Sequence, residues 1–187
     1  MVKAFKYIQN AVPDVPSWSD LIKALDYKFN NPHPEFVHEP REMFIFNNER
    51  CTDIFKYHLM DLQFWNVDNY RSLTSLIPQT KNLINFLKED VSGEWYIKCL
   101  MNLVGKEAAL TAHKDDHHVI SWQCEGSVEY RIYEDVDSDF GVPIDFHNLK
   151  YDSYILNPGD IMIMPAGTIH QAVVFQPRAT LILDIPV

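Results

Sequence analysis

The second half of the chain is a closely spaced series of short apolar segments, and this pattern limits the possible folds more than any other feature. After Ser92-Gly93 the segments are EWYIKCLMNLV, AALTAHKD, HVISWQC, VEYRIYE, DSYIL, DIMIMP, HQAVVF and ATLILDI. The residues between them include glycine and proline, which mark turns, as in Asn157-Pro158-Gly159. About seven or eight short strands with turns between them predict an antiparallel sandwich or barrel.

The first half of the chain has helical periodicity instead. In SWSDLIKALDYKF, Ser17 can cap a helix with Asp20 in its first turn, and one face of that helix is apolar: Trp18, Leu21, Ile22, Leu25 and Phe29. CTDIFKYHLMDL (51–62) also has helical spacing, and Pro78 suits the first turn of a helix that continues to Leu87. We therefore predict a mainly β (α+β) protein, with residues 1–93 as a helix-rich extension packed outside a β core formed by residues 94–187.

The segment GDIMIMPAGTIH (159–170) is the most specific local signal. Gly159 is followed after five residues by Pro165, then by Gly167 and, after two more residues, by His170. This spacing predicts a strand that ends in a tight Pro-Ala-Gly turn, and a return strand that begins with His170 pointing into the barrel. It resembles the second motif of the cupin family, although Val174 stands where that family usually has Asn.

A partner segment, HKDDHHVISWQCEG (113–126), resembles the first cupin motif, with Asp115 in place of the usual second His and Val119 in place of the usual Glu. Residues i and i+2 of a strand share a face, so His113 and Asp115 can both point inward. With His170 they give two imidazoles and one carboxylate, the facial triad of non-haem Fe(II) oxygenases. We predict these three residues as metal ligands and catalytic centre. His117 is a weaker alternative to Asp115, and we expect Asp116 and His118 to face solvent or lie in a loop.

Residues 97–185, about half of the chain, are similar to the 2-oxoglutarate-dependent oxygenases, including the JmjC-like group and the prolyl hydroxylases. The resemblance implies a double-stranded β-helix (cupin or jelly-roll fold) that uses Fe(II) and 2-oxoglutarate as cosubstrate. Many members carry an Arg after the distal His, with Ser or Thr two residues later, and Arg178 and Thr180 match this pattern. A guanidinium suits bidentate recognition of a carboxylate. Tyr130 could complete that pocket, whereas Val128 stands where JmjC-like proteins often have Lys.

Other interpretations stay open at this point. Arg178 could be an exposed turn residue after Pro177, and Tyr130 could be part of the core. The chain could be another metal-dependent cupin enzyme without 2-oxoglutarate, either an O₂-dependent dioxygenase, an isomerase or a lyase. A non-enzymatic cupin that binds a small molecule is a third possibility, because a fold does not fix a function.

The overall charge and the cysteines limit the partners. With 16 Lys and Arg against 26 Asp and Glu, the net charge is −10, which disfavours nucleic acid. The number of cysteines is odd and no two of them have a CxxC spacing, so we expect free thiols in a reducing compartment. No segment is typical of a signal peptide or a membrane span. We expect a cytoplasmic protein with a small-molecule or peptide substrate and no membrane partner, and the oligomeric state is left open.

Overall fold

The computed structural model describes residues 4–30, 45–46, 49–50, 59–65, 74–88, 95–102, 112–140, 144 and 147–187. Two helices have both of their bounds in this part of the chain, α1 (Trp18–Asn30) and α3 (Thr80–Leu87), and residues 74–76 are also helical. The remaining elements are strands: β1 (Lys6–Ile8), β2 (Ile45–Phe46), β3 (Glu49–Arg50), β4 (Leu59–Trp65), β5 (Tyr96–Asn102), β6 (His118–Glu125), β7 (Val128–Tyr133), β8 (Tyr151–Leu156), β9 (Ile161–Met164), β10 (His170–Val173) and β11 (Arg178–Ile185). None of the helices in these ranges is long and apolar enough to cross a membrane.

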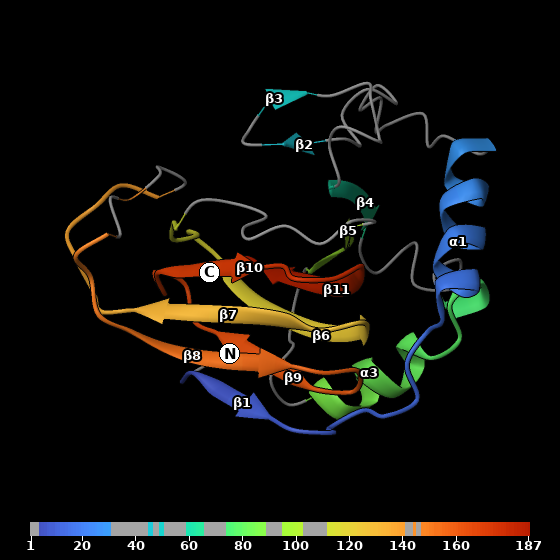
Figure 1. Ribbon diagram of the computed structural model, residues 1–187. Coiled ribbons are helices and arrows are strands. Elements are labelled where there is room, and N and C mark those ends of the chain that lie inside the picture. Colours follow the sequence, from blue (N-terminus) through green and yellow to red (C-terminus); the bar gives the residue numbers. More distant parts are fainter. Residues whose placement is uncertain are drawn as a thin grey trace.

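The strands form two main antiparallel sheets (Figure 1). The larger sheet has six strands in the order β1-β9-β6-β11-β5-β4, and the smaller has three in the order β10-β7-β8. A core cluster joins residues of both sheets, among them Val119 and Ile182 from the larger sheet and Tyr130 and Ala172 from the smaller. The two sheets therefore pack against each other, which confirms the predicted antiparallel sandwich.

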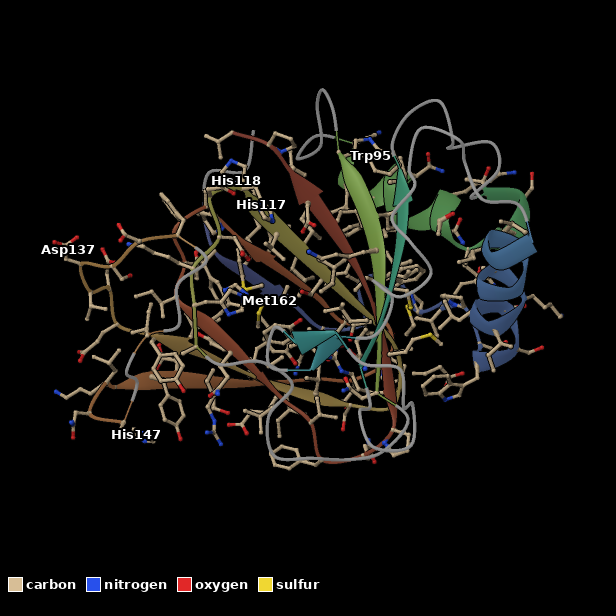
Figure 2. The ribbon with its side chains drawn as sticks, turned by 90° about the horizontal axis from the view of Figure 1, so that it is seen from above. Trp95, His117, His118, Asp137, His147 and Met162 are labelled. Carbon is tan, nitrogen blue, oxygen red and sulfur yellow. The ribbon has the colours of Figure 1, made fainter. Side chains whose placement is uncertain are left out.

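A second core cluster lies between the larger sheet and the helices. Alternate strand residues such as Leu181 and Leu183 contact it, together with Leu21 of α1 and Leu83 of α3. Figures 1 and 2 both show the two helices on one side of the molecule and the smaller sheet on the other. The larger sheet is thus covered on both faces, which explains why β6 and β11 are buried at nearly every position.

The beginning of α1 follows the sequence prediction. The backbone N–H of Asp20 donates to Ser17 Oγ (3.3 Å), and the backbone N–H and hydroxyl of Ser17 donate to the Asp20 carboxylate (3.0 and 2.8 Å). This is a capping box with Asp at its third position. Leu21 and Ala24 are fully buried, but Ile22, which was predicted on the packed face, is 53% exposed. The apolar stripe of the helix is therefore narrower than its sequence indicates.

The described part of residues 1–93 also contributes strands to the larger sheet. β1 pairs with β9, and β4 pairs with β5 from Leu59 opposite Asn102 to Trp65 opposite Tyr96. The helix predicted for residues 51–62 is therefore wrong at 59–62, and residues 51–58 lie outside the described ranges. The three-residue spacing of Leu59 and Leu62 fits a helix, but pairing with β5 satisfies the backbone polar groups along that strand and decides the conformation.

Candidate metal centre

The distal histidine stands where its motif predicts it. Residues 161–164 form β9, a turn follows at Pro165–Gly167, and His170 begins β10. Gly167 has a φ of 83°, which a glycine adopts without strain. The backbone N–H of Thr168 donates to the Pro165 carbonyl (3.1 Å), which closes the turn. The turn thus delivers His170 to the space between the sheets.

The other two predicted ligands lie beside His170. Ligand atoms of His113, Asp115 and His170 all lie within 4.8 Å of one another. The Asp115 carboxylate is 3.8 Å from His113 Nε2 and 3.6 Å from His170 Nε2, and the centroids of the two imidazole rings are 4.6 Å apart. A single ion placed between the three groups can contact all of them.

The local backbone around Asp115 differs from the expected strand. His113 pairs with His170 as an isolated bridge, and β6 begins only at His118. Residues 114–117 therefore form a loop, in which the Asp115 carbonyl accepts a hydrogen bond from the backbone N–H of Gly167 (2.9 Å). The inward direction of Asp115 comes from packing of this loop on the Pro165–Gly167 turn, and strand alternation does not account for it.

His170 is held as a neutral imidazole. Burial lowers its pKa to about 4, and the neighbouring His113 acts in the same direction. Its Nδ1 lies 2.9 Å from the carbonyl oxygen of Thr168. Because a carbonyl can only accept, Nδ1 carries the proton and Nε2 keeps its lone pair for a ligand.

The two histidines after Asp115 have different roles from each other. Figure 2 shows them side by side at the start of β6. His117 points to Asp184, with Nε2 3.3 Å from Oδ1, and this contact is the main reason why its pKa is raised to about 9. His118 is buried and its Nδ1 accepts a hydrogen bond from the backbone N–H of Ala166 (3.0 Å), so the expectation of a solvent-facing or loop residue is wrong. Asp116 is exposed, as expected.

Arg178 is fully buried, which rules out the exposed-turn alternative. Its Nε donates to Asn102 Oδ1 (2.8 Å) and its Nη1 to Thr180 Oγ1 (2.5 Å). Burial lowers its pKa, and the nearby Tyr130 opposes that shift. The remaining nitrogen, Nη2, is buried without a hydrogen-bond partner among the described residues. A buried cation with one nitrogen left without a hydrogen-bond partner is costly unless a ligand completes it.

Thr180 and Tyr130 both surround this guanidinium. The Thr180 hydroxyl accepts from Arg178 and donates its single proton to Gln123 Oε1 (2.6 Å). Tyr130 is buried, its hydroxyl pairs with Ser121 Oγ (3.0 Å), and its ring centroid is 6.4 Å from that of His170. Tyr130 therefore lies near both the three-residue cluster and Arg178, and the predicted site residues come together in one region.

Several polar residues of this region were missed by the sequence analysis. They share one property, which is a polar side chain at alternate positions of strands that are otherwise apolar: Lys98 and Asn102 in β5, Ser121 and Gln123 in β6, and Asp184 in β11. Alternation places such residues on the face toward the other sheet. That pattern could have identified them as lining residues, although it does not identify their partners.

Among the described residues, His147, Cys99 and Cys124 lie outside the cluster. His147 lies in the connection between β7 and β8 at the periphery of the molecule, as does Asp137 (Figure 2). Cys99 and Cys124 are buried thiols, as expected, and burial raises the pKa of Cys124. His33, His38, His58 and Cys51 lie outside the described ranges.

Comparison with known proteins places this site in a family context. Residues 83–184 match the JmjC domain family. Similar solved structures include YcfD of Escherichia coli, with 16% identity over 68% of this chain and 33% of that one and a TM-score of 0.48. A second structure of YcfD, described as a ribosomal oxygenase in complex with cobalt and 2-oxoglutarate, has 18% identity over 63% of this chain and 30% of that one and a TM-score of 0.43. The DMSP lyase DddQ of Ruegeria pomeroyi is also similar (19% identity, 50% and 39% covered, TM-score 0.36). The chain spans only about 30–39% of these proteins' length. None of the curated proteins matches the sequence significantly.

Proposed function

The chain belongs to the JmjC domain family, and from this membership together with the geometry of its site we propose that it is an Fe(II)- and 2-oxoglutarate-dependent oxygenase that hydroxylates its substrate. Its fold is the double-stranded β-helix of that family. The observation that carries the proposal is the joint presence of the His113, Asp115 and His170 cluster and a buried arginine with an unused donor.

The donor set suits Fe(II). Two imidazoles and one carboxylate on one side of an ion are the ligands of non-haem Fe(II) oxygenases, and they leave other positions open. In this chain Asp115 supplies the negative charge, and His170 presents Nε2 because Thr168 holds Nδ1. When bound, Fe(II) would supply the O₂ chemistry that couples oxidative decarboxylation of 2-oxoglutarate to hydroxylation of a C–H bond.

Arg178 suits the carboxylate of 2-oxoglutarate that is remote from the metal. Asn102 and Thr180 hold two of its nitrogens, so the guanidinium is fixed before a ligand arrives. Nη2 is the nitrogen available to a carboxylate, and a carboxylate there would also neutralise the buried charge. In this proposal Thr180 orients Arg178, and Tyr130 closes the space between Arg178 and the metal ligands.

The substrate of the proposed reaction is a small molecule or a peptide. We expect residues 1–93 to shape the entrance to the site, because connecting segments around a rigid core commonly carry binding functions. The net charge of −10 continues to disfavour nucleic acid.

The proposal is tested by adding Fe(II) and then 2-oxoglutarate to the metal-free protein without oxygen, and recording the visible spectrum. A weak charge-transfer band that needs both additions supports it. The band should be lost in His170→Ala and weakened in Arg178→Ala, and it should persist in the controls His147→Ala and Arg131→Ala, which alter the same residue types outside the site.

Two negative outcomes have different meanings. If iron binds but no band forms, the chain is another metal-dependent cupin enzyme and Arg178 has a structural role. If no metal binds, the cluster of His113, Asp115 and His170 is not a metal site, and a small-molecule-binding protein is the better hypothesis.

A further inference from the structure

The strand that carries Arg178 also carries a charged residue at its other end. Arg178, Thr180, Ile182 and Asp184 alternate along β11, and Ile182 packs between the two sheets. Asp184 therefore lies on the same inner face, and its carboxylate is largely buried. A buried carboxylate at a position where the neighbouring residues are apolar calls for an explanation, because burying a charge is costly.

Two basic side chains contact the carboxylate of Asp184. Lys98 Nζ of β5 lies 2.7 Å from Oδ2, and His117 Nε2 lies 3.3 Å from Oδ1. These contacts lower the pKa of Asp184 against the opposing effect of burial. Buried ion pairs contribute little net stability and are better attested as devices that fix one arrangement. The network therefore fits a positioning role.

The arrangement that it fixes is the loop that carries Asp115. His117 follows Asp115 by two residues, and its second nitrogen, Nδ1, contacts Asp116 Oδ1 of the same loop (2.9 Å). One imidazole thus connects the loop to β11. The loop is also connected by backbone hydrogen bonds, from Gly167 N–H to the Asp115 carbonyl and between His113 and His170, and by Lys114, whose Nζ lies 5.3 Å from the centroid of the Phe140 ring. These secure the beginning and middle of the loop, and His117 secures its end.

We propose that Asp184 and His117 are positioning residues, which hold the loop of residues 114–117 against β11 so that the Asp115 carboxylate stays between the two imidazoles. This inference rests on the proposed metal site. It also means that one strand, β11, sets the places of both the metal carboxylate and the guanidinium of Arg178.

The test is Co(II) binding, followed by the visible spectrum of the bound ion, with Asp184→Asn and His117→Gln. Both substitutions preserve size and remove the charged contact. We expect each to weaken Co(II) binding by about tenfold, the lower end of what partners outside the ligand set cause, and to change the ligand-field spectrum. The double variant should bind Co(II) as tightly as the single variant with the lower Co(II) affinity, because both substitutions remove the same contact.

Glu129→Gln is the matched control. It removes a carboxylate that pairs with Arg131 (3.1 Å) and accepts a hydrogen bond from Ser153 on the smaller sheet, and Co(II) affinity should stay unchanged. Circular dichroism at the temperature of the binding measurement checks that each variant is folded. If Asp184→Asn is unfolded, the test uses the Co(II) affinity of His117→Gln together with its thermal midpoint of unfolding. A purely structural role would lower the midpoint of unfolding and leave the affinity and spectrum of folded protein intact.

The outcomes separate this inference from the proposed function. If wild-type protein binds Co(II) and both variants bind it equally well, the positioning role is overturned while the metal site stands. If only His117→Gln weakens binding, His117 is itself a ligand and the inference is again overturned. If wild-type protein binds no Co(II), the metal site fails and the positioning role fails with it.

Discussion

His113 and His170 are joined by two backbone hydrogen bonds, from His113 N–H to the His170 carbonyl (3.1 Å) and from His170 N–H to the His113 carbonyl (2.9 Å). The two imidazoles are therefore brought side by side by the main chain, and no ion is needed to hold them there. A site assembled in this way loses little conformational entropy when a ligand binds. It follows that the protein should fold without metal and that metal should add to its stability.

The first prediction concerns this added stability. A free Co(II) concentration of about 100 times the Kd should raise the free energy of unfolding by about 2.7 kcal/mol. Asp115→Asn removes the negative ligand, and if the affinity falls tenfold the gain at the same Co(II) concentration drops to about 1.4 kcal/mol. Urea unfolding with and without Co(II) measures both values. An equal gain in both proteins would show that Asp115 is not a ligand.

The second prediction concerns the guanidinium of Arg178. Lysine keeps the charge but cannot contact Asn102, Thr180 and a carboxylate together, because it lacks the planar set of donors. Arg178→Lys should therefore weaken 2-oxoglutarate binding by roughly tenfold or more, since a charged hydrogen bond contributes about 1.5–3 kcal/mol. Calorimetric titration of the Co(II)-loaded protein measures the change, and Arg131→Lys on the smaller sheet is the control. Unchanged 2-oxoglutarate affinity in Arg178→Lys would remove Arg178 from the cosubstrate site.

The third prediction concerns the start of α1. Ser17→Ala removes the hydroxyl that accepts from Asp20 N–H and donates to the Asp20 carboxylate. Loss of such a cap costs about 1 kcal/mol of stability. Thermal unfolding should show it, and Ser19→Ala, at an exposed position inside the helix, should not. Equal midpoints for the two variants would mean that the end of α1 does not depend on this capping box.

Local sequence patterns predicted several strands of the second half of the chain well, both in the smaller sheet and in the larger sheet. The segments 118–124, 128–134, 152–156 and 179–185 each correspond to an observed strand to within a residue or so. The helix prediction failed at 59–62, where two leucines three residues apart fit a helix although the chain pairs with β5. That pairing joins segments far apart in the sequence, and no local period contains it.

The three residues of the candidate metal cluster could be named from the sequence, but most of the contacts around them could not. His113, Asp115 and His170 have motif spacing, and Thr180 follows Arg178 by two residues on the same strand. Asn102 and Gln123, in contrast, reach Arg178 and Thr180 only through the order β5-β11-β6. Likewise the contact between His117 and Asp184 depends on where β11 ends relative to β6. Such contacts follow from strand order and register, which the sequence alone did not reveal.

The last prediction tests the turn between β6 and β7, which packs against the residues that lead into β11. Gly126 has a φ of 64°, and a Cβ there would lie 2.1 Å from the carbonyl oxygen of Pro177 and 3.2 Å from the Cα of Arg178. Gly126→Ala must therefore shift the backbone beside Arg178, so we expect a loss of more than about 3 kcal/mol of stability and weaker 2-oxoglutarate binding. Gly167→Ala is the matched control, because its φ is also positive (83°) but nothing lies within 4 Å of the added Cβ. The unfavourable φ alone should cost about 1–2 kcal/mol. Urea unfolding of both variants measures the difference in their stability, and a titration with 2-oxoglutarate measures how tightly each binds it. Equal losses of stability in the two variants would show that the close approach of Gly126 to Pro177 does not constrain this turn.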